Sequence, residues 1–167
     1  MYDGPMEQKG TPSNRLDPRV KTAWRLQTAL VAVPLFLLSL LVAGGIGIAG
    51  GTLLIAILVP VVTLVVVVVW LGPVPEVRYR RWRWEVTEVE VRLQHGLIII
   101  ERTVIPMVRV QHVDTSQGPI MRAFGLSDIK VSTAAGSHSI PALADDDAGA
   151  LRDKIAVLAR VTDDGGL

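Results

Sequence analysis

The chain has 167 residues, of which half are hydrophobic and only 20% are charged, and it contains no cysteine. The charge is unevenly distributed, because the 50 residues from Leu26 to Pro75 include no Asp, Glu, Lys or Arg. This distribution excludes a soluble globular protein, and the lack of cysteine excludes a disulfide scaffold and a cysteine-ligated metal site.

The polar residues 1–20 contain several prolines and glycines, and they predict a disordered cytoplasmic tail. Residues 21–75 predict a transmembrane helical hairpin with spans at about 26–46 and 52–71. Each span has the ~20 apolar residues that a helix needs to cross a bilayer. The glycine-rich residues between the spans favour a tight turn over a helix–helix contact through Gly47 and Gly51.

Lysines and arginines flank the predicted hairpin at both ends, whereas the turn between the spans carries no charge. The positive-inside rule therefore predicts a multi-pass protein of the cell membrane with both termini in the cytoplasm. Trp24 and Trp70 lie near the cytoplasmic ends of the two spans. Because tryptophan rings settle at the headgroup level, we expect both to be membrane-interface anchors.

Residues 76–162 predict a second unit built of antiparallel strands and one C-terminal helix. Apolar residues alternate with polar ones along most of it, which is typical of half-buried strands. From Ala148 the apolar residues recur every three or four positions, which indicates a helix, and three aspartates at 145–147 are suited to cap it. Residues 163–167 are expected to be frayed. The predicted strands cover residues 80–86, 87–93, 97–104, 108–115, 126–133 and 138–140, with a turn at 94–96 and a connection at 117–125.

One string in this unit is specific enough to suggest a family. It runs Ile-Pro-Met-Val-Arg-Val-Gln-His-Val-Asp over 105–114, continues as Gln-Gly-Pro-Ile-Met-Arg over 117–122 and ends in Phe-Gly-Leu at 124–126. The string resembles the bacterial PH-like domain of YdbS-like membrane proteins, once described as a membrane-flanked domain of unknown function. The resemblance covers residues from about 20 to 160. It implies a pleckstrin-homology-like fold, a bent barrel of about seven antiparallel strands capped by a C-terminal helix, and it brings no catalytic residues.

A basic cluster directly follows the second span, and its arginines are candidate contacts to lipid headgroups. A basic residue near an anionic membrane surface is worth ~1 kcal/mol, and the same residues also set membrane topology. The interleaved Trp82 and Trp84 are expected in the core of the first strand, because they alternate with charge. The candidate headgroup contacts are Arg78, Arg80, Arg81 and Arg83.

Polar residues in the family-like string define a second candidate site, a polar groove. Two explanations stay open for them: they line a binding groove, or they only support the fold around the Gly118-Pro119 turn. The candidate groove residues are Arg109, Gln111, Gln117 and Arg122.

No catalytic or metal-binding site is predicted. His112, Asp114 and Ser116 alternate along one predicted strand, whereas the members of a hydrolase triad come from separate parts of a fold. The three histidines lack the spacing of metal ligands. We therefore expect no enzyme and no cofactor. The 12 basic and 13 acidic residues from position 76 onward argue against a nucleic-acid partner.

These features together predict a non-enzymatic, membrane-anchored PH-like binding module at the cytoplasmic face. Its expected partners are membrane lipids and either a protein or further copies of the chain, docking at an exposed strand edge or in the groove between sheet and helix. One alternative is an anionic-lipid-binding or envelope-stress sensor. Another is an accessory subunit of a transport or efflux assembly.

Overall fold

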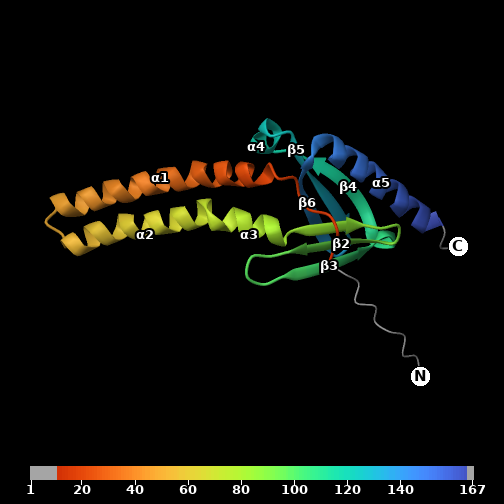
Figure 1. Ribbon diagram of the computed structural model, residues 1–167, viewed down its shortest axis with the longest axis horizontal. Helices are drawn as coiled ribbons and strands as arrows, with labels where there is room; N and C mark the ends of the chain where they lie inside the picture. Colours follow the sequence, from red (N-terminus) through yellow and green to blue (C-terminus); the bar gives the residue numbers. More distant parts are fainter. Residues whose placement is uncertain (1–10, 165–167) are drawn as a thin grey trace, which may run out of the picture.

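A computed structural model describes residues 11–164 and shows a long helical hairpin that projects from a β domain (Figure 1). Helix α1 (Val20–Ile48) packs antiparallel to α2 (Leu53–Leu71), and Gly72 alone separates α2 from α3 (Pro73–Arg81). Both arms are long and apolar enough to cross a membrane. From Leu26 to Trp70 most of their apolar side chains are exposed rather than packed in a protein core, which is typical of helices surrounded by lipid. Gly50 turns the chain at φ +72° between them.

Helix α3 replaces the start of the first predicted strand, so the expectation of a strand from residue 80 is wrong. Pro73 stands at the helix N-terminus, where its missing N–H costs nothing. Glu76 and Arg80 form an ion pair of 3.0 Å at i,i+4 spacing, which supports one more helical turn. The domain therefore begins its first strand only at Arg83.

The β domain has two three-stranded antiparallel sheets, ordered β1-β2-β3 and β4-β5-β6. A 3₁₀ turn, η1 (Met107–Arg109), leads from one sheet into the other. β3 and β4 are not paired with each other, so the sheets do not close into the expected bent barrel, and the described residues hold six strands rather than about seven. The strands are β1 (Arg83–Val86), β2 (Glu90–His95), β3 (Glu101–Pro106), β4 (Val110–Ser116), β5 (Leu126–Thr133) and β6 (Gly136–Ala144).

Helix α5 (Asp145–Asp164) lies across the second sheet and packs against β4, β5 and η1 (Figure 1). One hydrophobic core joins both sheets, α5 and the base of α1. Val91 and Leu93 come from the first sheet, Ile129 and Val131 from the second, and Ile155 from α5. The predicted C-terminal helix and the strand at 126–133 are confirmed. Of the predicted frayed end, residues 165–167 lie outside the described residues, and α5 continues through Asp164.

Residues 11–19, the N-terminal strap, do not form the free tail that the sequence predicts. Asn14 exchanges two backbone hydrogen bonds with Trp84 of β1, at 3.0 and 3.1 Å, and the Asp17 amide donates to the Ala142 carbonyl of β6. The strap thus connects one sheet to the other. Leu16 is 2% exposed and belongs to the core, a role that proline and charge around it concealed. Residues 1–10 of the predicted tail lie outside the described residues.

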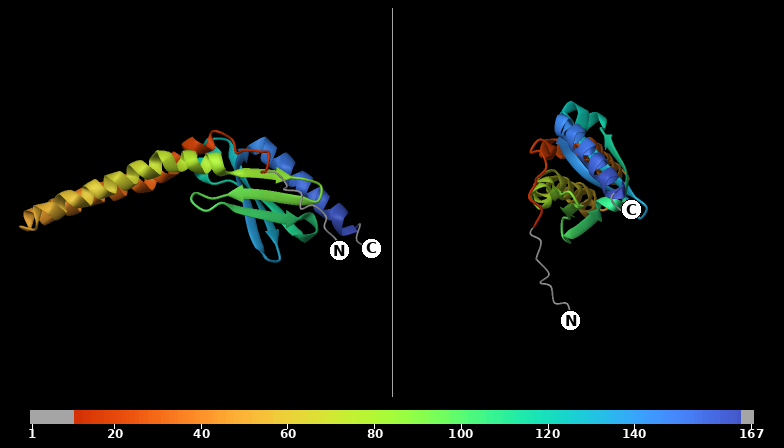
Figure 2. Two further views of the ribbon diagram at one scale, coloured as in Figure 1. Left: turned by 60° about the horizontal axis from the view of Figure 1, so that its bottom comes forward. Right: turned by 90° about the vertical axis from the view of Figure 1, so that its right-hand side faces the viewer.

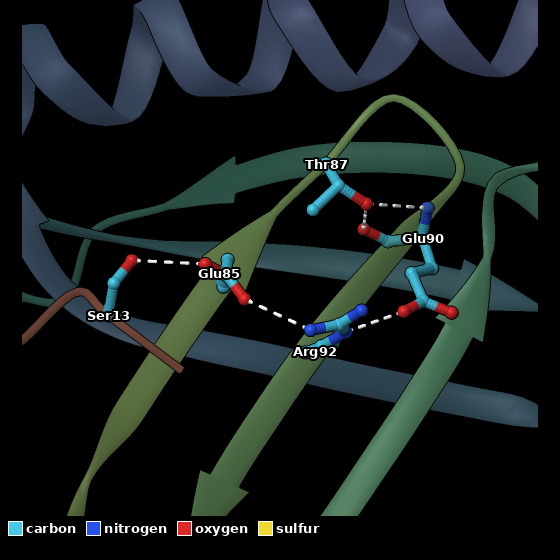
Figure 3. A network of polar contacts seen from close by, with 5 residues as sticks. All are labelled: Ser13, Glu85, Thr87, Glu90 and Arg92. Atoms are coloured by element: carbon cyan, nitrogen blue, oxygen red, sulfur yellow. Dashed lines mark hydrogen bonds and ion pairs between the residues drawn. The ribbon is translucent and has the colours of Figure 1, made fainter. Parts of the chain in front are cut away.

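A polar network ties the strap to the first sheet (Figure 3). The Ser13 hydroxyl donates to Glu85 at 3.2 Å, and Glu85 accepts from the Arg92 guanidinium at 3.4 Å. Arg92 also donates to Glu90, whose backbone amide and carbonyl both bond the Thr87 hydroxyl in the β1–β2 turn. Each carboxylate in the network therefore meets a hydrogen-bond donor.

Two connections differ from the predictions. Residues 96–100 form a loop between β2 and β3, and residues 97–100 are exposed, although their continuous apolar character predicted a strand from residue 97. The 117–125 connection contains a short helix, α4 (Pro119–Ala123), which packs against α1 and β5. Both connections lie at the end of the domain that faces the hairpin (Figure 1).

Candidate functional site

The junction between hairpin and domain is a packed neck rather than a flexible linker. Lys21 of α1 pairs with Glu76 of α3 at 3.3 Å, and its ammonium lies 5.0 Å from the centre of the Tyr79 ring. The Arg78 guanidinium lies over the Trp24 ring at 4.1 Å, within the range of a cation–π contact. These contacts hold α1 and α3 together just where the apolar spans end.

The structure places Trp24 in the protein core rather than against lipid. Its side chain is 6% exposed and belongs to the core cluster of the domain. The prediction of an interface anchor relied on its position near the end of a span, and position in the sequence does not show which side of the helix meets the domain. Trp70, the other predicted anchor, is exposed on α2.

The four arginines of the predicted headgroup cluster do not form one face. Arg78 covers Trp24, and Arg83 donates to the Trp82 carbonyl at 2.8 Å. Burial, and then the charge of Arg15, lower the pKa of the Arg83 guanidinium. Arg81 donates to the Leu97 carbonyl of the β2–β3 loop. The Arg80 side chain is 74% exposed, although it pairs with Glu76.

The predicted polar groove divides into two places. Gln117 and Arg122 lie together beside the start of α5, where Arg122 donates to the Gln117 side chain at 3.3 Å. Gln117 in turn donates to the Leu126 carbonyl at 3.1 Å and reaches Asp145. These bonds support the fold of the connection. Arg109 is exposed on η1, and Gln111 lies on β4.

Gln111 lines a different feature, an open groove of about 730 Å³ between β4 and the C-terminal half of α5. β4 is an edge strand, paired with β5 on one side. The groove has a mixed lining, with aliphatic side chains from η1, β4 and α5 beside the polar Gln111, His112 and Arg160. We call it the β4–α5 groove; its lining residues are Val108, Val110, Gln111, His112, Val113, Ala156, Ala159 and Arg160.

His112, Asp114 and Ser116 are exposed at alternate positions along β4, and His112 also lines the β4–α5 groove. Asp145, at the start of α5, accepts from the Ser127 hydroxyl, so it contributes to the local fold. Among residues 11–164, no group of three or more histidine, aspartate or glutamate side chains could hold a metal ion.

The β domain with its C-terminal helix and hairpin defines the class of the protein. Residues 28–159 match the family model described as the bacterial PH domain, and the chain belongs to this family. It is similar to UPF0699 transmembrane protein YdbS of Bacillus subtilis (strain 168), with 42% identity over 153 residues that cover 92% of this chain and 96% of the relative.

A second relative, UPF0699 transmembrane protein YdbT of the same organism, is 27% identical over 82 residues. That match covers 49% of this chain and 17% of the relative. No solved structure matches the chain. The resemblance to YdbS-like membrane proteins is thereby confirmed, and the chain is a membrane protein with a PH-like domain.

Proposed function

We propose that this chain is a non-catalytic binding module, anchored in the cell membrane, whose PH-like domain docks an extended segment of a partner protein in the β4–α5 groove. One observation carries the proposal: β4 is an edge strand with an open groove beside it, lined by both aliphatic and polar side chains. An edge strand offers backbone donors and acceptors to a further strand, and a neighbouring groove selects its side chains.

The groove chemistry favours a particular kind of segment. Val108, Val110 and Val113 with the alanines of α5 suit small aliphatic side chains at alternate positions of a strand. Arg160 at the end of the groove suits an acidic side chain or a terminal carboxylate. Because the hairpin confines module and partner to one surface, a weak contact of this kind is sufficient for association.

The domain is proposed to lie on the cytoplasmic side. Arg15, Arg19, Lys21 and Arg25 precede or begin the first arm, and the arginines of α3 follow the second. The turn at the far end of the hairpin is uncharged, so the positive-inside rule places the domain and both termini in the cytoplasm.

Photo-crosslinking in the native membrane tests the docking surface. A photoreactive side chain at the exposed Val108 should form an adduct with a distinct protein, whereas the same group at the exposed Ser139, on β6 at the opposite edge of the sheet, should not. Ala159→Trp fills the groove and should abolish the adduct, while Ala123→Trp, at an exposed position of α4, should leave it unchanged. If the only adducts are with other copies of the chain, the groove mediates self-association rather than binding of a distinct partner protein. No adduct specific to Val108 would overturn the proposal.

A second candidate function is binding of anionic lipid, favoured by the exposed Arg80 at the neck. Anionic lipid in nanodiscs should then raise the melting temperature of the full-length protein more than zwitterionic lipid does. Arg80→Gln should reduce that difference, and Arg152→Gln on α5, away from the neck, should not. Equal melting temperatures in both lipids would exclude this candidate.

A further inference from the structure

The loop between β2 and β3 exposes an uninterrupted aliphatic run, Leu97-Ile98-Ile99-Ile100. Ile98 is 89% exposed and Ile99 is 77% exposed. Surface turns are ordinarily polar. The β1–β2 turn, at the opposite end of β2, has Thr87 and Glu88 and only one exposed aliphatic residue, Val89. Contiguous exposed aliphatic side chains of this kind indicate a contact with another apolar phase.

The loop has a defined shape. Gly96 adopts φ +132°, and a Cβ there would lie 1.8 Å from the Ile99 carbonyl oxygen, so the chain closes on itself at a point where only glycine fits. The His95 ring stacks on Trp82 with their centres 5.4 Å apart. Arg81, the last residue of α3, donates to the Leu97 carbonyl. The loop is therefore fixed to the end of the helix that leaves the second span.

The loop also faces the hairpin side of the domain. In both Figure 1 and the left view of Figure 2 its tip extends from the sheet in the direction of α2 and α3. The nine residues of α3 cover roughly 14 Å at ~1.5 Å per residue. The loop begins beside the far end of α3 and returns toward the apolar span, where the interfacial layer adds ~5–7 Å to the hydrocarbon core.

We propose that Ile98, Ile99 and Ile100 insert into the bilayer interface and form a third membrane attachment of the domain, in addition to the two arms of the hairpin. The proposal takes α1 and α2 as membrane-spanning. A bilayer is favoured over a second copy or a soluble partner because, once the hairpin is inserted, its surface already faces the loop. Arg81, which donates to the Leu97 carbonyl, and Arg102, two residues after Ile100 in β3, lie at the base of the loop and suit phosphate headgroups.

Because the chain contains no cysteine, single-cysteine variants of the full-length protein report the depth of one chosen position. Ile99→Cys carries an environment-sensitive fluorophore. The protein is placed in nanodiscs without spin-labelled lipids, with lipids that carry the spin label at a shallow acyl position, and with lipids that carry it at a deep acyl position near the level of Val61. Val61→Cys in α2 is the control within the membrane. Val89→Cys, 65% exposed at the opposite end of the sheet, is the control in water.

We expect lipid quenching at Ile99 and Val61 and none at Val89. A label at Ile98→Cys should lose its quenching when Ile99 becomes Asp and keep it when Ile99 becomes Leu. Quenching at Ile99 no stronger than at Val89 would overturn the proposal. If the label at Ile99 is shielded from a water-soluble quencher but is not quenched by lipid, the loop contacts protein rather than the bilayer. Absence of quenching at Val61 would overturn the membrane-spanning hairpin as well.

Discussion

Truncation of Leu16 in the N-terminal strap should strongly destabilise the β domain, although the strap precedes the first membrane arm. Leu16 is 2% exposed and packs in the core. Leu16→Ala removes three carbon atoms, which at ~0.8 kcal/mol per buried methylene gives roughly 2.4 kcal/mol. The cavity left behind raises the expected loss to about 3–5 kcal/mol of the free energy of unfolding. If the substitution instead makes the strap detach from the domain, the loss of unfolding free energy cannot exceed what the contacts of the strap contribute.

Thermal unfolding of the full-length protein in nanodiscs measures this loss. Trp84 is a suitable reporter, because its indole N–H donates to the Arg15 carbonyl of the strap at 3.2 Å. For a domain of this size, a loss of 3 kcal/mol corresponds to a decrease in melting temperature of about 10 °C or more. Leu41→Ala, at an exposed position of α1, is the matched control and should leave the transition unchanged. A decrease for Leu16→Ala within about 0.5 kcal/mol, as ordinary surface substitutions give, would refute the strap as part of the core.

Three further predictions concern the loop, the neck and the strap. Gly96→Ala should cost more than about 3 kcal/mol of unfolding free energy, because φ +132° is strained for alanine and its Cβ would lie 1.8 Å from the Ile99 carbonyl oxygen. Gly136→Ala, also at positive φ but with open space around it, should cost only the strain of about 1–3 kcal/mol in the same melt. Arg78→Ala removes the cation over Trp24 and should cost about 1–2 kcal/mol, whereas Arg80→Ala should stay within about 0.5 kcal/mol, by denaturant titration. The hydrogen bond from Arg19 holds the pKa of Asp17 below its ordinary value of 3.8. The Asp17 carboxylate therefore stabilises the fold above pH 3.8, and this stabilisation is lost as the pH falls through the lower pKa of the folded state. In a series of unfolding measurements at different pH, Asp17→Asn should make the loss of stability at acidic pH less steep.

The periodicity of apolar residues correctly predicted elements that have one solvent-exposed face and one buried face. The strand at 126–133 and the helix from 145 follow their patterns closely, because packing on one face is what those patterns record. Where a segment obeys a different constraint, the same reasoning failed. Residues 97–100 are apolar without being a strand, and Arg80 continues a helix through its pairing with Glu76, a feature that alternation does not reveal.

The candidate sites were less predictable than the fold, because each depends on distant segments that meet only in three dimensions. Gln111 lies beside Ala159, far along the chain in α5, whereas its sequence neighbour Arg109 lies outside the groove. Trp24 is covered by Arg78 across the neck. The family-like string grouped Gln117 and Arg122, which support the connection, with Gln111, which lies in a different part of the domain.

The strap has a consequence for how the protein is made. Leu16 precedes the membrane hairpin and Val20 begins it, whereas other members of the same core come from β5, β6 and α5 after it. The domain core therefore cannot be completed until both arms of the hairpin have been synthesised. A fragment that starts at residue 76 lacks part of its own interior. Insertion into the membrane and folding of the domain are one coupled process, and the domain, once folded, has no free linker about which to turn.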